Sequence, residues 1–401
     1  MDLNAQIKKE TASILDEVIA IRRHIHAHPE LSFEEYETSK FVSNKLAEWN
    51  IPHETGIVKT GIVGLIEPTN ASENCIALRA DLDALPITEM NDVAYKSTNE
   101  GVMHACGHDV HTAILLGTAK ILNELKDQLK VAVKLIFQPG EEKLPGGASL
   151  MIAENVLENP KVSEIYALHV FPELEAGKVG LRGGMYMASC DEIRMTIKGK
   201  GGHGAMPHQN IDPILISAHL ITSLQQIVSR NCPPQIPCVL SFGRIEGLGA
   251  TNVIPDEVKL EGTFRTMNET WRKSAHERIK SQSEALVHSM GGEIDVDIQV
   301  GYPYLENDPD LTIAAKQKAV NLLGEDNVVD LPLRLTGEDF AYFSQKIPAT
   351  FIRIGVKNEA KEIIYPVHNK RFDIDEKAIQ VGMQIFLAMV LFETAENTEC
   401  D

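Results

Sequence analysis

The chain has 401 residues and a formal net charge of −19, from 38 Lys and Arg against 57 Asp and Glu. A chain this acidic repels nucleic-acid phosphates, and it contains no block of clustered Lys and Arg that would reverse the effect locally, so nucleic acid is excluded as a partner. Hydrophobic residues (43%) and charged residues (24%) lie close to the averages of globular proteins, and the length predicts two or three domains.

The first 18 residues alternate apolar and charged side chains without an apolar core, which predicts that no signal peptide is present. The longest apolar run, residues 385–392, is far shorter than the roughly 20 residues that cross a bilayer, so it predicts a buried C-terminal helix and no membrane span. Without an export signal, we expect reduced thiols and a cytoplasmic protein. The scattered cysteines are Cys75, Cys106, Cys190, Cys232, Cys238 and Cys400.

The first half of the chain alternates helical and strand patterns. Strands alternating with helices predict an α/β domain with a mixed, largely parallel sheet. A capping box, formed by Ser32 and Glu35, predicts the start of the second helix. The predicted elements are helices at 5–26, after Ser32 and at 111–125, with strands at 60–66, 75–79 and 131–137.

The pattern changes near residue 189. From there to residue 299 the order of elements is β-α-β-β-α-β, which predicts a small sheet with helices on one face. We therefore expect an inserted domain at 189–299 and one further domain made of 1–188 and 300–401. The elements of the inserted domain are expected at 191–198, 213–230, 239–244, 257–265, 270–290 and 293–300.

A metal-ligating pattern lies between Met103 and His111, where nine residues contain three histidines, a cysteine and an aspartate. Cys106 and His108 form a Cys-x-His pair, a spacing that lets a loop or strand end direct a thiolate and an imidazole at one metal ion. His104 and His111 could instead have structural roles.

Adjacent carboxylates, Glu141 and Glu142, follow the predicted strand 131–137. Open α/β sheets place their sites at such strand ends. Neighbouring side chains point in different directions, so one could bind a metal while the other faces a water, an arrangement that suits hydrolysis. The alternative is a solvated acidic turn.

Four further residues are candidates for the same site. Asp81 and Asp83 follow the strand 75–79 and could orient ligand histidines, although Asp is also common in turns after strands. His169 and His368 are isolated, and an isolated histidine is more often structural than a ligand.

Ten motifs, in this order, make the chain resemble the aminoacylase/carboxypeptidase family of two-metal amidohydrolases and metallopeptidases, in its hippurate hydrolase-like branch. The resemblance covers essentially the whole chain. The motifs are RRHIHAHPELSFEE (22–35), RADLDALP (79–86), HACGHDVHTA (104–113), FQPGEE (137–142), ALHVFP (167–172), KGKGGHGAMPH (198–208), GATNVIPDE (249–257), EGTFRTM (261–267), TGEDFAYF (336–343) and YPVHNKRFDID (365–375).

The resemblance implies a zinc-peptidase-like catalytic domain with an inserted, ferredoxin-like lid and dimerisation domain. It implies that Glu141 is the general base and that Asp83 supports a metal ligand. Other branches have a metal histidine at the place of Asp81, so the ligand set here is the one that contains cysteine. The implied ligands of the two metals are Cys106 as the bridge, His108, Glu142, His169 and His368.

Three residues of the inserted domain resemble substrate-contacting residues of the family. His203 resembles a histidine that reaches into the site from the partner subunit of a homodimer, where it would stabilise an oxyanion. Asn252 and Arg265 resemble residues that hold the substrate, and an Arg fork suits a free carboxylate. From the sequence alone, His203 would be a residue of a glycine-rich turn and Arg265 a surface residue.

The leading interpretation is a two-metal amidohydrolase that cleaves N-acyl amino acids, of the N-acetyl or N-benzoyl type, to a carboxylic acid and an amino acid. A dipeptidase or metallocarboxypeptidase of the same family is the alternative, because both substrates present an amide beside a carboxylate. A metal-binding protein without turnover has no use for Glu141, and a phosphoesterase fits a cysteine ligand poorly.

Thiolate and imidazole ligands favour Zn, with Mn, Co or Ni as alternatives. Two departures from the family pattern are expected to change loop shape and substrate preference near the site. Related sequences have a shorter, glycine-rich turn in place of residues 143–147, and commonly Ala in place of Gly140.

Overall fold

The computed structural model describes residues 2–70 and 74–396 and divides the chain into two compact units. The first unit comprises Met1–Gly184, Glu306–Pro332 and Asp339–Asp401. The inserted unit comprises Met185–Leu305 and Leu333–Glu338. The insertion therefore begins and ends a few residues outside the range 189–299 expected from the sequence, and a short later segment joins it.

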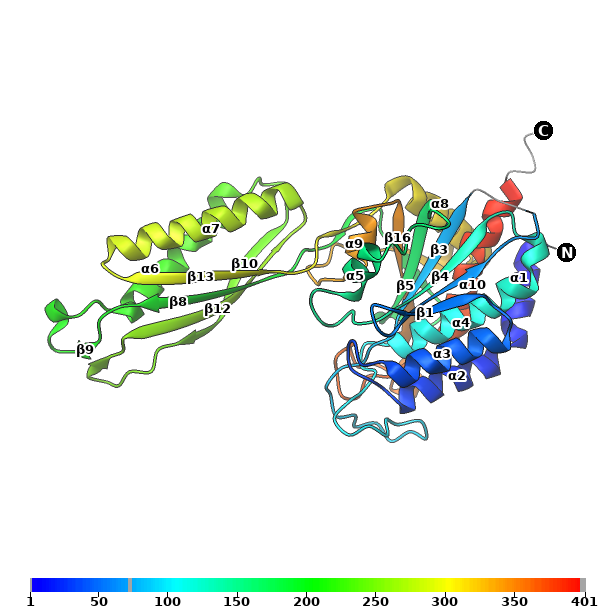
Figure 1. Ribbon diagram of the computed structural model, residues 1–401, viewed down its shortest axis with the longest axis horizontal. Helices are drawn as coiled ribbons and strands as arrows, with labels where there is room; N and C mark the ends of the chain where they lie inside the picture. The colour runs from blue at the N-terminus through cyan, green and yellow to red at the C-terminus, as the bar shows by residue number, and fades with distance from the viewer. Residues whose placement is uncertain (1, 71–73, 397–401) are drawn as a thin grey trace. The chain divides into compact units, whose positions relative to one another are not determined.

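The described residues of the first unit contain an eight-stranded mixed sheet (Figure 1). Its centre is parallel, because β4, β3, β5 and β16 run in one direction. The pairs β1–β2, β2–β4 and β16–β6 are antiparallel, whereas β15 is parallel to β6. The sequence-based prediction of a mixed, largely parallel sheet is confirmed. The strands, in order across the sheet, are β1 His53–Ile57, β2 Gly61–Ile66, β4 Ala132–Gln138, β3 Cys75–Asp81, β5 Glu164–Glu175, β16 Ala349–Lys357, β6 Val179–Leu181 and β15 Val328–Asp330.

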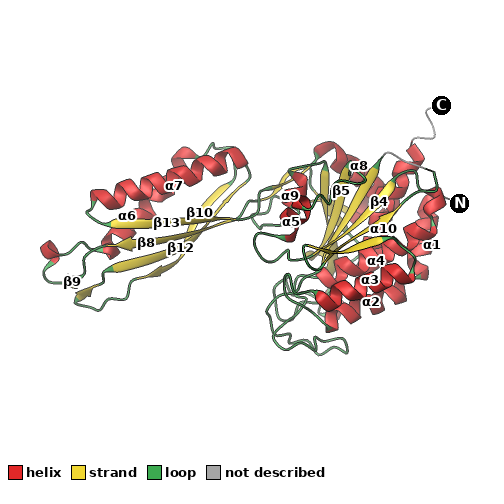
Figure 2. Ribbon diagram, in the orientation of Figure 1, coloured by secondary structure: helices red, strands yellow, loops and turns green. Residues whose placement is uncertain are grey.

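Helices cover this sheet, as Figure 2 shows for the first unit. Most of them share one apolar core with alternate residues of the strands, such as Ile76 and Leu78 of β3. The intervening residues of β3 point to the other face, where Arg79 pairs with Asp339, close to α9. The helices of the core face are α1 Leu3–Ser13, α2 Leu15–Ala27, α3 Tyr36–Glu48, α4 His108–Glu124, α8 Pro309–Leu323 and α10 Lys377–Glu396, whereas α5 Gly147–Ala153 and α9 Ala341–Ser344 contact each other and the strands β4 and β16.

The expected C-terminal helix is confirmed as α10. Its residues from Ala378 to Leu391 are almost all buried, because α10 packs against α1, α4 and α8 and against strand β16. A helix that is apolar on all sides requires such burial.

Two sequence-based predictions near the N-terminus are wrong. The single helix expected at 5–26 is divided into α1 and α2 at Ile14. The capping box does not form, because Ser32 donates to Asp83 and the carboxylate of Glu35 bonds to residues outside its own helix, while α3 begins only at Tyr36. The side chains that matched a capping pattern are used in tertiary contacts.

The inserted unit has the order of elements that the sequence predicts. Within its described residues a four-stranded antiparallel sheet is ordered β10-β12-β8-β13, and α6 and α7 pack on it. A small ribbon, β9 Gly202–His203 with β11 Val253–Ile254, was not predicted. The main elements are β8 Asp191–Lys198, α6 Pro213–Gln226, β10 Cys238–Glu246, β12 Glu257–Thr266, α7 Glu269–Ser289 and β13 Glu293–Val300.

Among the described residues, no helix is both long and apolar enough to cross a membrane. The cysteines of the described ranges, Cys75, Cys106, Cys190, Cys232 and Cys238, are free thiols. Cys400 lies outside the described residues.

A buried ion-pair network connects α2 with the start of α4. The Arg22 Nε lies 2.7 Å from Asp109 Oδ2, and its Nη2 lies 2.9 Å from Asp373 Oδ1. His26 Nδ1 also lies 2.8 Å from the same Asp109 oxygen. Burial raises the pKa of Asp109, but Arg22 and then His26 outweigh this effect and lower it. Arg22 thus joins the segment after His108 to the segment after His368.

We expect Arg22→Leu to lower the free energy of unfolding by about 3–5 kcal/mol, because removing one partner of a buried pair leaves the other charge uncompensated. Arg23→Leu is the matched control. Arg23 pairs with Glu376 while 48% of its side chain is exposed, so its loss should cost less than about 1 kcal/mol. Urea unfolding measures both. Equal effects of the two substitutions would contradict the importance of the buried network.

Candidate metal centre

The candidate residues follow the carboxyl ends of the central parallel strands. Asp81 ends β3, Glu141 follows β4 and His368 follows β16. His169 lies in β5 beyond its pairing with β3, which ends at Ala167. The carboxyl ends of parallel strands meet at one edge of a sheet, so the topology brings these distant segments together.

A first group of possible ligand atoms comes from Cys106, His108 and His169. One atom from each lies within 4.8 Å of the other two, and all three residues are buried. The Cys106 Sγ lies 3.4 Å from His169 Nε2. Cys106 ends the loop before α4, and His108 is the first residue of that helix.

Gly107 makes this loop geometry possible. Its φ is +85°, and an added Cβ would lie 2.6 Å from the side chain of Val170. Only glycine fits this backbone conformation and this close approach without strain. Cys106 and His108 are therefore placed on either side of a turn that packs directly on β5.

The hydrogen bonds of both histidines leave the same ring nitrogen available. His169 Nδ1 donates to the carbonyl oxygen of Val170 at 2.8 Å, and His108 Nδ1 lies 3.1 Å from Asp83 Oδ1. With Nδ1 as the donor, Nε2 of a neutral ring carries the lone pair that a metal requires, and in His108 a cation would take the place of the Nε2 proton. Burial and then the charge of Arg353 lower the pKa of His169 well below its usual value, which keeps its ring neutral.

A second group of possible ligand atoms comes from Cys106, Glu142 and His368, again within 4.8 Å of one another. Cys106 belongs to both groups, as a bridging ligand would. His368 Nε2 lies 3.1 Å from Glu142 Oε1. His368 has φ +64°, which is uncommon outside glycine, and its N–H donates to Ala105 O at 2.7 Å, next to Cys106.

Asp83 connects the two groups of possible ligands, because it bonds to one residue of each. Its Oδ1 lies 3.1 Å from His108 Nδ1, while its Oδ2 accepts from the backbone N–H of Glu142 at 2.9 Å and from the Ser32 hydroxyl at 2.6 Å. Burial alone would raise the pKa of Asp83, but its contacts outweigh burial and lower the pKa. The hydrogen bond from His108 makes the largest of these contributions. Asp83 is thus an ionised carboxylate that fixes one possible ligand from each group.

Glu141 lies beside these atoms, on the turn between β4 and α5. Its carboxylate and that of Glu142 both approach His108, in a group whose possible ligand atoms lie within 4.8 Å of one another. Glu141 is buried, and its Oε1 accepts from the backbone N–H of Asp339 at 3.4 Å.

The donor set suits a divalent cation. Among the described residues, His108 Nε2 is one of the few buried side-chain polar atoms that form no hydrogen bond. Burial and then the charges of Glu142 and Glu141 raise the pKa of the Cys106 thiol well above its usual value. The site therefore concentrates negative charge and lone pairs that a cation would satisfy.

The other histidines of the motif have structural positions. His111 Nδ1 lies 2.6 Å from Asp81 Oδ1, and its Nε2 accepts from the backbone N–H of Val170 at 3.0 Å, so both ring nitrogens are engaged. Asp81 also pairs with Arg79 at 2.7 Å. Burial lowers the pKa of His104 to about 4, which keeps it neutral.

The residues expected from the inserted unit are not all together. His203 lies on β9, pairs with Val253 in the ribbon and is adjacent to Asn252, whose carbonyl accepts from Gly204. Arg265 lies near the C-terminal end of β12, away from the ribbon. Its Nε donates to the hydroxyl of Thr263 at 3.2 Å. The eight residue steps from Glu257, where β12 begins, to Arg265 correspond to roughly 27 Å of strand.

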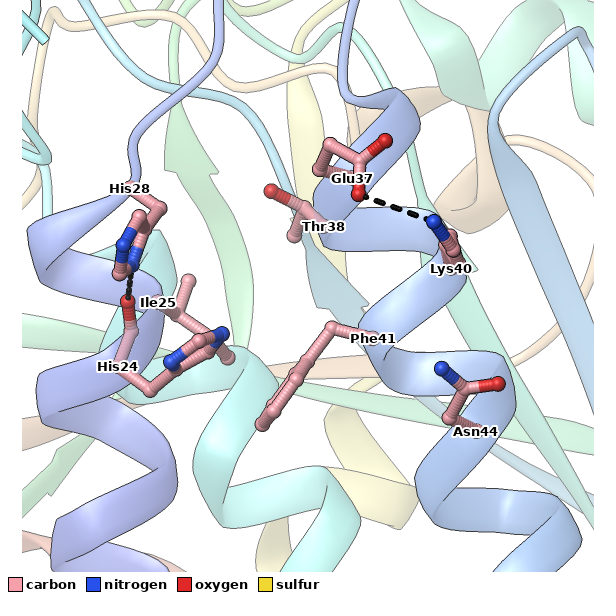
Figure 3. A pocket seen from close by; sticks show the side chains of 8 residues that line it. All are labelled: His24, Ile25, His28, Glu37, Thr38, Lys40, Phe41 and Asn44. Atoms are coloured by element: carbon pink, nitrogen blue, oxygen red, sulfur yellow. Dashed lines mark hydrogen bonds and ion pairs between the residues drawn. The ribbon is translucent and has the colours of Figure 1, made fainter.

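A cavity of about 270 Å³ between α2 and α3 is separate from this cluster (Figure 3). Its walls include the ring of Phe41, which stacks on His24 with ring centroids 4.3 Å apart. None of the residues that line it is a candidate site residue.

Sequence reasoning missed two residues that support the site. Ser32 and Glu35 matched a capping pattern, but they bond to Asp83 and to the turn before Glu141. The available signal was that both residues lie in the motif RRHIHAHPELSFEE, which also carried the resemblance to the family.

Comparison with known proteins identifies the class. The model of Peptidase family M20/M25/M40 matches residues 77–391. The chain belongs to this family and is a hydrolase that acts on amide bonds.

Individual relatives match over nearly the full length. The chain is 39% identical to N-acetyl-L-cysteine deacetylase of Bacillus subtilis, over 95% of this chain and 88% of the relative. It is 38% identical to thermostable carboxypeptidase 2 of Saccharolobus solfataricus, over 95% and 96%. The structure of the YXEP protein of Bacillus subtilis, a dinuclear metal binding peptidase from the M20 family, matches with a TM-score of 0.82 and 34% identity, over 96% of this chain and 99% of that one.

We expect Cys106→Ser to lower the metal content per chain, because a serine hydroxyl stays protonated where a bound thiol becomes a thiolate. Elemental analysis after dialysis measures this. Cys75→Ala is the matched control, since Cys75 is a buried free thiol on β3 that belongs to neither ligand group. A wild-type metal content in the Cys106→Ser protein would exclude Cys106 as a ligand.

Proposed function

We propose that the protein is a two-metal amidohydrolase that cleaves N-acyl amino acids to a carboxylic acid and a free amino acid. The observation that carries the proposal is the convergence of two ligand groups on Cys106, with Glu141 beside them. The proposed ligands are Cys106, His108, Glu142, His169 and His368.

Each group of residues has a defined task in this proposal. When bound, two divalent cations supply Lewis acidity, which acidifies water and polarises an amide carbonyl at neutral pH. Glu141 takes the proton of the attacking water and returns it to the leaving amine, a role typically worth about 10² to 10⁴ in rate. Asp83 keeps His108 in the tautomer that presents Nε2.

Zinc is the proposed metal, with manganese, cobalt or nickel as alternatives. A thiolate and three imidazoles suit zinc, while the carboxylate of Glu142 is also acceptable to the other three ions.

His203 is the proposed oxyanion donor. Its Nδ1 accepts from the backbone N–H of Ala205 at 3.0 Å, so the neutral ring carries its proton on Nε2. An Nε2–H can donate to the oxygen on which negative charge develops. Asn252 would assist on the same ribbon, and the Arg265 guanidinium would hold the substrate carboxylate.

We further propose a homodimer formed through the inserted unit. In one chain, His203 and Asn252 lie at the ribbon that precedes β12, whereas Arg265 lies near the end of β12. One substrate can contact both His203 and Arg265 if the His203 comes from a second copy. Strand β10 is an edge of its sheet, and large apolar side chains are exposed near it, among them Ile245 and Leu248. An exposed edge with apolar side chains is suited to pairing.

A dipeptidase or carboxypeptidase activity is the second candidate, favoured by the near full-length match to a carboxypeptidase. A hydrolysis panel separates the two. It compares N-acetyl, N-benzoyl and longer N-acyl amino acids with dipeptides on protein loaded with each metal. Faster hydrolysis of the N-acyl amino acids supports the proposal, and turnover of dipeptides alone would contradict it.

We expect Glu141→Gln to bind metal as the wild type does but to lose about 10² to 10⁴ of kcat, because an amide cannot accept the proton. Kinetics on the best substrate of the panel, combined with elemental analysis, test this. Normal turnover by the variant would remove Glu141 as the base.

We expect His203→Ala to reduce kcat by about 10² to 10³ without loss of metal, because it deletes an oxyanion donor. His208→Ala is the control, since His208 is an exposed histidine of the neighbouring turn. If His203 acts from the partner, mixing the Glu141→Gln and His203→Ala proteins restores one complete site per mixed dimer. Unchanged kcat in His203→Ala would exclude the role, and no recovery in the mixture would exclude action across the dimer.

A further inference from the structure

Glu35 is a buried carboxylate whose hydrogen bonds all lie outside its own helix. Its Oε1 accepts from the backbone N–H of Gly140 at 2.8 Å and of Phe33 at 2.9 Å, and its Oε2 accepts from the Thr60 hydroxyl at 2.6 Å. Gly140 immediately precedes Glu141. A side chain at the start of α3 therefore holds the peptide group that leads into the proposed base.

The ring of Phe33 supports the same turn. Gly140 has φ +60°, and an added Cβ would lie 2.4 Å from Phe33 Cζ, with two further ring atoms closer than 3.0 Å. The ring thus occupies the space that the methyl group of an alanine would need here. The contact and the positive φ together account for a glycine at this position.

The segment 32–35 also holds the residue on the other side of Glu141. The Ser32 hydroxyl donates to Asp83 at 2.6 Å, and the same oxygen of Asp83 accepts from the backbone N–H of Glu142 at 2.9 Å. The N–H groups of both residues that flank Glu141 are consequently held by this short segment, that of Gly140 directly and that of Glu142 through Asp83.

We propose that Glu35 is a positioning residue for Glu141, which fixes the Gly140 peptide so that the base carboxylate is correctly directed. The inference rests on the proposed hydrolytic function. A small displacement of a catalytic group is enough to cost about 10- to 100-fold in rate.

The chemistry of the contact defines the test variants. Glu35→Gln retains Oε1 as the acceptor for Gly140 and Phe33, and its amide can face the Thr60 hydroxyl, which can rotate to accept. Burial and then the charge of Asp83 raise the pKa of Glu35 to about 7, so a neutral amide is a close replacement. Glu35→Ala removes every acceptor.

The experiment combines kinetics of the metal-loaded protein with hydrogen exchange of the metal-free protein. For Glu35→Ala we expect faster exchange at the Gly140 amide and a kcat lower by about 10- to 100-fold, with KM and metal content close to wild type. Glu35→Gln should restore both exchange protection and most of kcat. Glu37→Ala, which removes an exposed glutamate of the same helix, should change neither.

If Glu35→Ala does not fold, Gly140→Ala carries the test. Its Cβ would collide with the Phe33 ring, so kcat should fall, and adding Phe33→Ala should recover part of it. Wild-type kcat in Glu35→Ala, loss of metal as its main defect, or no recovery in the double variant would each overturn the inference. An inactive wild type would instead overturn the proposed function.

Discussion

The carboxylate of Asp83 is the contact on which the rest of the candidate site depends. It joins its own segment, directly after β3, to three segments that are distant in the sequence: the end of the first motif (22–35), the first turn of α4 and the turn after β4. Its three donors are the Ser32 hydroxyl, the His108 ring and the Glu142 backbone N–H. Each loop alone could adopt many conformations. Their common bond to one buried, ionised group restricts the loops to a single arrangement.

Negative charge is the second constraint on this region. Asp81, Glu141 and Glu142 each have a carboxylate oxygen close to His108, and Asp83 bonds to His108 and to the backbone of Glu142, while the buried thiol of Cys106 lies beside them. Burial lowers the pKa of His108, but Asp81 and then Asp83 outweigh it and raise the pKa to about 10. Such a field favours cations at the ligand atoms. Part of the negative charge of the chain, which has a net charge of −19, is thus concentrated where divalent ions would compensate it.

The sequence predicts the fold well where periodicity carries the information. The alternation at 191–198 and 293–300 coincides with β8 and β13, and the apolar run at 385–392 lies in α10. It fails where a side chain has two possible uses. Ser32 and Glu35 match a capping box, but each bonds to a residue distant in the sequence instead. Ser32 donates to the carboxylate of Asp83, and Glu35 accepts from the N–H of Gly140.

Prediction of the candidate site divides in the same way. Residues that follow strands, such as Glu142 and His368, meet because parallel strands end at one edge, and this follows from the topology. The roles of Asp81 and His111 do not follow from spacing, because they depend on the contact between these two residues and on the Val170 N–H, and these partners are distant in sequence. The separation of His203, on the ribbon before β12, from Arg265, near the end of β12, follows from the folded structure and not from the sequence pattern.

The central claim is that this chain assembles one centre for two divalent cations with Cys106 as the shared ligand. Zinc titration of the metal-free protein, with the binding stoichiometry measured by calorimetry and elemental analysis, tests it most directly. The account predicts two zinc ions per chain in the wild type and fewer than two when Cys106 is replaced. A single zinc ion in the wild type, or two ions in both proteins, would contradict it.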